Sequence, residues 1–339
     1  MSSLRLGRRA LLVLAAGLHF TVAALFAAPP TPIEGGFTLV VLPDTQFYAL
    51  NFPDTYLAQT RWIAENVRRY NIPYVLHVGD ITDKNTTPEW EVAAKAHAQM
   101  AGVVPCALLP GNHDLGKGRA SGLTEHFPTA DFKKLPTFGA FYDKEPARSD
   151  NSFHLFEAGG RKWLVLALEF GPRDDVLRWG NDVVKRHPDR SVIMITHAYL
   201  RPDNTRYDKR VKVMVKGKPG DKGLGKSVLA QDPAGFNDGE DMWQKLISQH
   251  ANFAFVISGH VCLTGRRTDT SRHGNPVHQM VVDYQNQPNG GDGFLRLLQF
   301  SRDMKTVRVS DYSPTLDQIS DRPNTSFELA VPPAPMAKR

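Results

Sequence analysis

The sequence has few of the features that mark several large classes of protein. Its 339 residues contain only two cysteines, Cys106 and Cys262, and no internal repeat or low-complexity tract. The formal net charge of +6 falls to about +3 once residues 1–28, with three arginines and no acid, are set aside. So small a charge indicates no nucleic-acid-binding surface. No Gly-x-Gly-x-x-Gly motif follows the first apolar run, which excludes the usual dinucleotide-binding domain.

The two cysteines are not expected to form a disulfide. Cys106 begins an apolar run and lies about five residues, or about 16 Å at strand rise, from the end of that run. Cys262 belongs to a polar motif that should lie at the far end, whereas disulfide geometry needs Cα atoms within about 7 Å. We therefore expect two free thiols, with Cys106 as a small core residue.

Hydrophobic runs of membrane-spanning length are also lacking, except at the N-terminus. Three arginines precede an apolar run over residues 10–28, and a proline-rich segment follows. This order is typical of an export signal, so we expect residues 1–28 to be a signal peptide and 29–36 a linker. The exported protein would be periplasmic or extracellular, and the arginine pair is compatible with a twin-arginine route. The alternative is an uncleaved membrane anchor, because the run is near spanning length.

Apolar runs alternate with amphipathic segments through the first third of the chain. The predicted elements are strands at 37–43, 73–79 and 103–110 and helices at 54–70 and 87–100. A strand–helix–strand–helix–strand order is typical of βαβ units and of a largely parallel sheet. Residues 115–150 show little periodicity and are predicted to form a long insertion.

The rest of the chain is predicted to hold a hairpin, two helices and further strands. Gly159 and Gly160 separate the two strands of the hairpin. The other predicted elements are helices at 173–186 and 238–250 and strands at 191–196, 253–259, 277–283, 294–300 and 306–310. Residues 314–339 are expected to be a C-terminal extension, with a disordered proline-rich tail from Val331.

Residues 201–226 form a strongly basic stretch with nine Lys/Arg against three Asp. Charged runs of this kind usually remain solvated on the surface. The alternative is a lid over an anionic substrate, because the stretch follows His197 closely in the sequence.

Five of the predicted strands end in side chains that can bind metal ions. In chain order the sets are Asp44 and Gln46; Asp80 and Asp83; Asn112, His113 and Asp114; His197; and His260 and Cys262. Each set alone is typical of a turn or a helix cap. Turns do not need carboxylate, amide and imidazole groups at five strand ends, however. Because open α/β sheets bind ligands at the carboxyl ends of their strands, we expect these residues to converge.

In this order, the motifs resemble those of the calcineurin-like metallophosphoesterases. The family pattern is Asp-x-His, Gly-Asp-x-x-Asp, Gly-Asn-His-Asp/Glu, a lone His after a strand, and Gly-His-x-His. The resemblance covers residues 37–313, the predicted catalytic domain. It implies an α/β fold, a four-layer α/β/β/α sandwich in which helices flank two mixed central sheets. It also implies a hydrolase that cleaves a phosphate mono- or diester, small or macromolecular, with a water activated by two divalent cations.

The resemblance implies one shared ligand and two partly separate ligand sets. Asp80 would bridge the two cations. The first cation would also bind Asn112, His197 and His260, and the second would also bind Asp44, Gln46 and Cys262. Imidazole, carboxylate and amide groups together suit Zn, Fe, Mn or Ni.

Other matched residues would act around the metals. His113 would stabilise the phosphoryl oxygens or protonate the leaving group. Asp83 and Asp114 would orient the ligating side chains. The candidate substrate contacts are Asn112, His113 and Tyr199.

Two positions depart from the family pattern, and both fall in the second metal site. Gln46 and Cys262 stand where the family has histidine. A glutamine oxygen is a weaker ligand than an imidazole nitrogen, whereas a thiolate would bind zinc strongly. The alternative function is therefore a family-fold binding protein with a degenerate metal site, which would recognise phosphate or glycan at the cell envelope.

Overall fold

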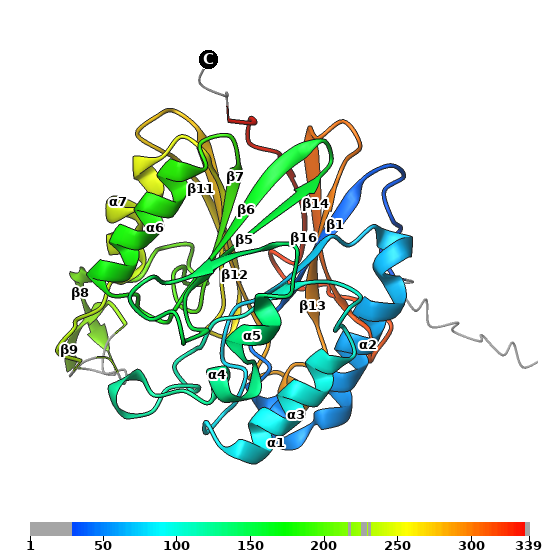
Figure 1. Cartoon of the computed structure of the whole chain (residues 1–339), viewed down its shortest axis with the longest axis horizontal. Helices are drawn as coiled ribbons and strands as arrows, with labels where there is room; N and C mark the ends of the chain where they lie inside the picture. Colours follow the sequence, from blue (N-terminus) through cyan, green and yellow to red (C-terminus); the bar gives the residue numbers. More distant parts are fainter. Residues whose placement is uncertain (1–28, 216–217, 225–228, 230–231, 336–339) are drawn as a thin grey trace, which may run out of the picture.

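A computed structural model describes residues 29–215, 218–224, 229 and 232–335, so the predicted signal peptide lies outside the described residues. Two seven-stranded β-sheets pack face to face, and helices cover the outer side of each sheet (Figure 1). This is the four-layer sandwich that the motif resemblance implied, and that prediction is confirmed. Among the described residues, no helix combines the length and apolar character that a membrane crossing requires.

The first sheet joins the N-terminal βαβ units to the C-terminal strands. Its order is β15-β14-β13-β1-β2-β3, with β16 also paired to β14. The strands are β1 (Phe37–Leu42), β2 (Tyr74–His77), β3 (Cys106–Ala107), β13 (Leu295–Phe300), β14 (Thr306–Ser313), β15 (Gln318–Ile319) and β16 (Ser326–Ala330). Strands β1 to β3 are parallel, as predicted, and β13 pairs antiparallel with β1. The outer helices are α2 (Pro53–Tyr70) and α3 (Thr87–Ala98).

The second sheet has the order β11-β12-β10-β7-β6-β5-β4. Its strands are β4 (Phe138–Phe141), β5 (Ser152–Ala158), β6 (Arg161–Leu168), β7 (Ser191–Thr196), β10 (Phe253–Ser258), β11 (Leu263–Thr270) and β12 (Pro276–Asp283). The central strands β6, β7, β10 and β12 are parallel, and the outer pairs are antiparallel. The covering helices are α6 (Asp174–Arg186) and α7 (Gly239–Lys245).

The central strands are buried on both faces, which explains their unbroken apolar runs. In β1, Leu39 and Val41 face the second sheet and share a core cluster with Ile193 of β7. The alternating residue Val40 faces the helices and packs in another cluster with Ile63 of α2. The sheets and helices therefore hold the carboxyl ends of β1, β2, β7 and β10 in a fixed relation.

Several elements differ from the sequence predictions. A short helix, α1 (Gln46–Asn51), begins at Gln46 of the first metal-type motif, where no helix was predicted. The helix predicted over 238–250 ends at Lys245, because Leu246 is not helical, and the 3-10 helix η2 (Ile247–Gln249) follows. The insertion at 115–150 contains the 3-10 helix η1 (Lys117–Arg119), helices α4 (Leu123–His126) and α5 (Thr129–Phe132), and strand β4.

The C-terminal prediction was partly wrong. Strand β16 pairs with β14, so the first sheet continues beyond the predicted domain end at 313. Val331 is buried, and its N–H donates to the carbonyl of Lys305 at 2.8 Å. Arg161 also donates to the carbonyl of Pro332. A disordered tail therefore does not begin at Val331.

The basic stretch forms a separate two-stranded hairpin beside α7, with β8 (Asp208–Val215) and β9 (Lys218–Lys222) (Figure 1). Part of its charge is paired within the protein. Lys209 pairs with Asp241 of α7, and Lys212 pairs with Asp221 across the hairpin. The choice between a solvated surface and a substrate lid stays a prediction.

Candidate metal centre

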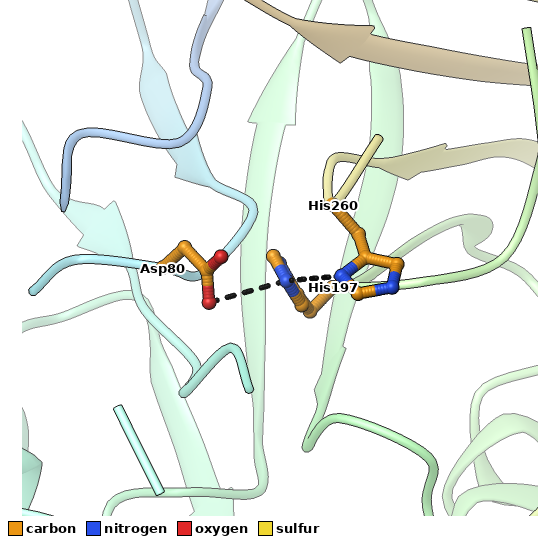
Figure 2. Close-up of side chains that lie close together, drawn as sticks. All are labelled: Asp80, His197 and His260. Carbon is orange, nitrogen blue, oxygen red and sulfur yellow. Dashed lines mark hydrogen bonds and ion pairs between the residues drawn. The ribbon is translucent and has the colours of Figure 1, made fainter. Parts of the chain in front are cut away.

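The predicted ligands come from both sheets and meet at one edge of the sandwich. Asp44 follows β1, Asp80 follows β2, His197 follows β7 and His260 follows β10. Asp80, His197 and His260 each present one ligand atom, and these atoms lie within 4.8 Å of one another. Figure 2 shows the Asp80 carboxylate on one side of the His197 ring and His260 on the other. The structure thus brings together residues that are far apart in the sequence.

His197 is the centre of this cluster and is fully buried. Its Nδ1 lies 3.0 Å from the carbonyl oxygen of Val78, which can only accept, so the ring proton lies on Nδ1. Nε2 faces Oδ1 of Asn112 at 3.0 Å and Oδ1 of Asp80 at 3.2 Å. Burial lowers the pKa of His197, but the charge of Asp80 and its hydrogen bond outweigh burial and raise it. A proton on Nε2, or a cation in its place, would satisfy these oxygens.

His260 completes the cluster. Its Nδ1 lies 3.2 Å from Nε2 of His197. Burial, and second the neighbouring His197, lower the pKa of His260 to about 3, so its ring is uncharged at neutral pH. A neutral imidazole is the form that ligates metals. Among the described side chains, His197, His260, Asp80 and Asn112 therefore fit a divalent cation.

Three further oxygens at this edge are buried and have no hydrogen-bond partner among the described residues. They are Oδ1 of Asp44, Oε1 of Gln46 and Oδ2 of Asp80. Leaving such a group unpaired costs about 1–3 kcal/mol, and more for a charged group. Burial, and then the charges of Asp283 and Asp80, raise the pKa of Asp44 well above its usual range. A second cation would satisfy these oxygens.

Glycines let the backbone approach the carboxylates closely. A Cβ on Gly111 would lie 2.1 Å from Oδ1 of Asp80, and one on Gly259 would lie 1.9 Å from Oδ1 of Asp44. Asp80 and His260 have positive φ angles of 49° and 79°. Strained backbone of this kind is common where side chains must be aimed into a site. The glycines of the Gly-Asn-His and Gly-His motifs are thus required by space.

Asp114 fixes the loop that carries Asp80. Its carboxylate accepts hydrogen bonds from the backbone N–H groups of Ile81, Thr82 and Gly111, at 2.7 to 3.0 Å. It also accepts from the Thr82 hydroxyl at 2.7 Å. Burial, and then the charge of Asp80, raise the pKa of Asp114 to about 6. The sequence analysis predicted that Asp114 orients ligating side chains. In the structure its contacts are with the backbone of the loops that carry Asp80 and Asn112.

We expect Asp114→Asn to weaken cation binding by about 10- to 100-fold, the usual effect of losing a group that orients metal ligands. The asparagine side chain would present its NH₂ group to a backbone N–H that now donates to Asp114. Two donors cannot pair, so the loop would lose part of its support. Isothermal titration of the metal-free protein with Mn²⁺ measures the effect. Unchanged affinity in a folded variant would contradict this role.

His113 and Asp83 lie together beside Asp80. The backbone N–H of His113 donates to Oδ1 of Asp80 at 3.0 Å, and its Nδ1 donates to the carbonyl oxygen of Asp83 at 2.8 Å. The carboxylate of Asp83 accepts from Nε2 of Gln46 at 3.4 Å, so the Gln46 oxygen is the free end of that amide. The His113 side chain is 39% exposed, and its Nε2 has no hydrogen-bond partner among the described residues.

Two buried residues at this edge were missed. His77 accepts the N–H of Gly79 on Nδ1 at 3.2 Å, which leaves Nε2 to donate to the Thr45 hydroxyl at 3.0 Å. It thus supports the loops of both Asp44 and Asp80. Its signal was a polar residue inside a buried apolar run.

Asp283, the last residue of β12, is the other. It is fully buried, and its two oxygens accept from the backbone N–H and the side chain of Gln285, at 2.7 and 2.9 Å. Burial is the main cause that raises its pKa to about 6. Its signal was an apolar run that leads to an Asp, as the runs before Asp44 and Asp80 do.

One of the predicted site residues, Tyr199, is buried and bonded within the protein. Tyr199 is fully buried, and its hydroxyl donates to Gln279 and accepts from Arg206, so it offers no group to a substrate. The predicted contact of Tyr199 with substrate is therefore wrong. Cys262 and Cys106 are free cysteines. Burial, and then the charge of Asp283, raise the pKa of Cys262 to about 11.

Comparisons with known proteins agree with this geometry. The chain matches the family model of calcineurin-like phosphoesterases over residues 37–263. It is 32% identical, over 293 residues, to the uncharacterized protein YvnB of Bacillus subtilis (strain 168). The match covers 84% of this chain and 20% of that protein, so the chain spans about one fifth of the curated relative's length.

A solved structure has a similar fold. A dimetal phosphatase from Danio rerio superposes with a TM-score of 0.52, over 87% of this chain and 98% of that one. The two sequences are 12% identical, so this likeness concerns the fold alone.

Proposed function

The chain belongs to the calcineurin-like phosphoesterase family, and from this premise we propose that it hydrolyses a phosphate mono- or diester with two divalent cations. It is thus a hydrolase of phosphoester bonds. The observation that carries the two-cation proposal is the pairing of a cluster around His197 with three unpartnered buried oxygens nearby. Buried polar groups are normally satisfied, and no described side chain satisfies these.

The ligand sets divide between the two cations. Asn112, His197 and His260 would hold the first, Asp44 and Gln46 would hold the second, and Asp80 has an oxygen for each. Oδ1 of Asp80 faces Nε2 of His197, which belongs to the first set. The unpartnered Oδ2 of Asp80 remains for the second set. When bound, such cations supply Lewis acidity to the phosphoryl oxygens and lower the pKa of water toward neutrality.

His113 is the proposed proton donor. The hydrogen bond to Asp83 fixes the ring and keeps a proton on Nδ1. In the imidazolium form Nε2 also carries a proton, which it can share with a phosphoryl oxygen or give to the departing alkoxide or phenoxide. Asp83 and Asp114 act as positioning residues, Asp83 on His113 and Gln46, and Asp114 on the Asp80 loop.

Other parts of the proposal stand on the sequence. The substrate is a phosphate ester, small or macromolecular, and the imidazole-containing set suits Zn, Fe, Mn or Ni. Export to the periplasm or the extracellular space follows from the N-terminal pattern. The competing proposal is a binding protein for phosphate or glycan, favoured by the weaker donor at Gln46.

Removal of the cations tests the two proposals against each other. We expect about two divalent cations per chain, measured by inductively coupled plasma mass spectrometry. We also expect hydrolysis of aryl phosphate mono- or diesters, lost on dialysis against a chelator and restored by Mn²⁺ or Zn²⁺. One cation or none, with no turnover under Zn, Fe, Mn or Ni, would instead favour the binding protein.

A further inference from the structure

We propose that Arg201 binds a negatively charged group on the alcohol part of the substrate. The substrate class is then phosphate esters whose leaving group carries its own carboxylate, phosphate or sulfate. The inference rests on the phosphoester hydrolysis proposed above and deepens it, because it names a chemical feature of the substrate. Neither the motifs nor the comparisons assign a role to Arg201.

Arg201 lies beside the candidate metal centre, with one aromatic ring linking it to His260. It belongs to the loop that follows β7 and His197. Its guanidinium carbon is 5.1 Å from the centre of the Tyr207 ring. The Tyr207 ring in turn packs against the His260 ring, with 5.7 Å between the two ring centres. Tyr207 is buried, whereas the Arg201 side chain is 34% exposed, so a ligand from solvent can reach the guanidinium.

The loop that carries Arg201 is fixed by backbone hydrogen bonds. The N–H of Arg201 donates to the carbonyl of Thr205 at 2.8 Å, and its carbonyl accepts from the N–H of Asn204 at 2.9 Å. The side-chain oxygen of Asn204 accepts from the backbone N–H of Arg266 in β11 at 2.8 Å, which ties the loop to the second sheet. A cation on a fixed loop binds an anion at a smaller entropic cost than a cation on a mobile segment.

The other cations of the basic stretch are already paired, as far as the structure describes their side chains. Each lies between 2.6 and 3.4 Å from a carboxylate oxygen. The pairs are Arg206 with Glu240, Lys209 with Asp241, Arg210 with Asp208, Lys212 with Asp221, and Lys222 with Asp203. These paired cations have little charge left for a substrate.

Arg201 differs from them because its guanidinium has no hydrogen-bonded acid. Its Nε is buried and has no hydrogen-bond partner among the described residues. Oδ2 of Asp203 lies 4.0 Å from this Nε, which is too long for a hydrogen bond. The Asp203 carboxylate instead accepts from the N–H and hydroxyl of Thr205 and from Lys222. Buried donors normally have a partner, and a guanidinium matches the geometry of carboxylate and phosphate groups. An anionic ligand would supply the missing partner.

The position of Arg201 indicates which part of the substrate it meets. The phosphoryl group would bind at the cluster of Asp80, His197 and His260, whose ligand atoms lie within 4.8 Å of one another. Among the described residues, Arg201 forms no hydrogen bond or ion pair with this cluster and contacts Tyr207 instead. The guanidinium is therefore placed for a group beyond the ester oxygen. A neutral leaving group would leave its Nε unpaired, so the site favours a charged one.

Phosphonates, which cannot be hydrolysed, test the inference by binding alone. The probes are phenylphosphonate and its meta- and para-carboxy derivatives, titrated by calorimetry into the metal-loaded protein. We expect the wild type to bind one carboxy derivative at least about 10-fold more tightly than phenylphosphonate, the usual effect of a charge-assisted hydrogen bond. We expect Arg201→Gln to lose this preference. The matched control Arg210→Gln removes a cation that pairs with Asp208, and it should keep the preference.

The wild-type comparison needs no variant, so it does not depend on the folding of one. Equal binding of all three probes by the wild type would overturn the inference, and so would a preference that survives in Arg201→Gln. Loss of the preference in Arg210→Gln as well would assign it to the overall charge of the stretch and would also overturn it. If the metal-loaded wild type binds no phosphonate and hydrolyses no aryl phosphate ester, the proposed function fails, and this inference fails with it. If it hydrolyses such esters without preferring a carboxy probe, only the role of Arg201 fails.

Discussion

Replacing Asp80 with asparagine is expected to lower kcat/KM for an aryl phosphate ester by at least about 10³-fold, or about 4 kcal/mol of transition-state stabilisation. The reason is the position of the carboxylate. One oxygen lies 3.2 Å from Nε2 of His197, and the other is buried and unpartnered. An asparagine has the same shape but no charge, so two adjacent cations would repel one another without a shared anion.

Steady-state kinetics and metal counting together measure this effect. We expect fewer than two cations per chain in Asp80→Asn under conditions that load the wild type fully. The Asp303→Asn control changes charge by the same amount on the surface and should keep full activity. A variant of Asp80 that keeps both cations and more than a tenth of the activity would show that this carboxylate is not the bridge.

A large loss of stability is expected from Asp311→Ala. Arg296 and Asp311 are both fully buried, and they form a two-pronged ion pair, Nε to Oδ1 at 2.6 Å and Nη2 to Oδ2 at 2.8 Å. Removing one partner leaves an uncompensated guanidinium in the core. We expect the free energy of unfolding to fall by about 3–5 kcal/mol.

Urea denaturation of the metal-free protein measures the change, and a double variant isolates its cause. Replacing both partners, as Arg296→Met with Asp311→Leu, removes the charge as well as the pair. We expect most of the lost stability to return, because apolar replacement of a buried pair is often neutral. Equal destabilisation in the single and double variants would assign the effect to packing rather than to the unpaired charge.

The strands that the sequence located best are those buried on both faces. Strand β7 begins and ends where predicted, because the apolar run 191–196 needs no solvent face. Strand β11 was missed, because Leu263–Thr270 is an edge strand in which every residue after Leu263 is polar or glycine. Helix α1 was missed because it has only six residues, begins inside a metal-type motif at Gln46, and ends at Asn51, just before α2 begins at Pro53. Short elements of this kind depend on tertiary packing more than on propensity.

The site was also predictable only in part. Because Asp80, His197 and His260 each follow a predicted strand, and parallel strands share one carboxyl edge, the sequence predicts that these residues lie at the same edge. It does not predict which way the chain turns after that edge. Tyr199 lies two residues beyond His197 and packs instead in the helix-facing cluster with Trp243. Asp283 was counted as the last residue of a strand, although that position is itself at the edge.

Because the candidate ligands come from two sheets, they are synthesised at different times as the chain grows. Asp44, Asp80 and Asn112 belong to the N-terminal part, and His197 follows Asn112 by 85 residues. His260 is made later still. An incomplete chain therefore carries three oxygen donors and no imidazole from the second sheet. Such an oxygen-only set binds transition metals more weakly than the complete set. At the proposed two-cation site, capture of the cations would therefore be a late event in biosynthesis, after the second sheet has been made and has docked on the first.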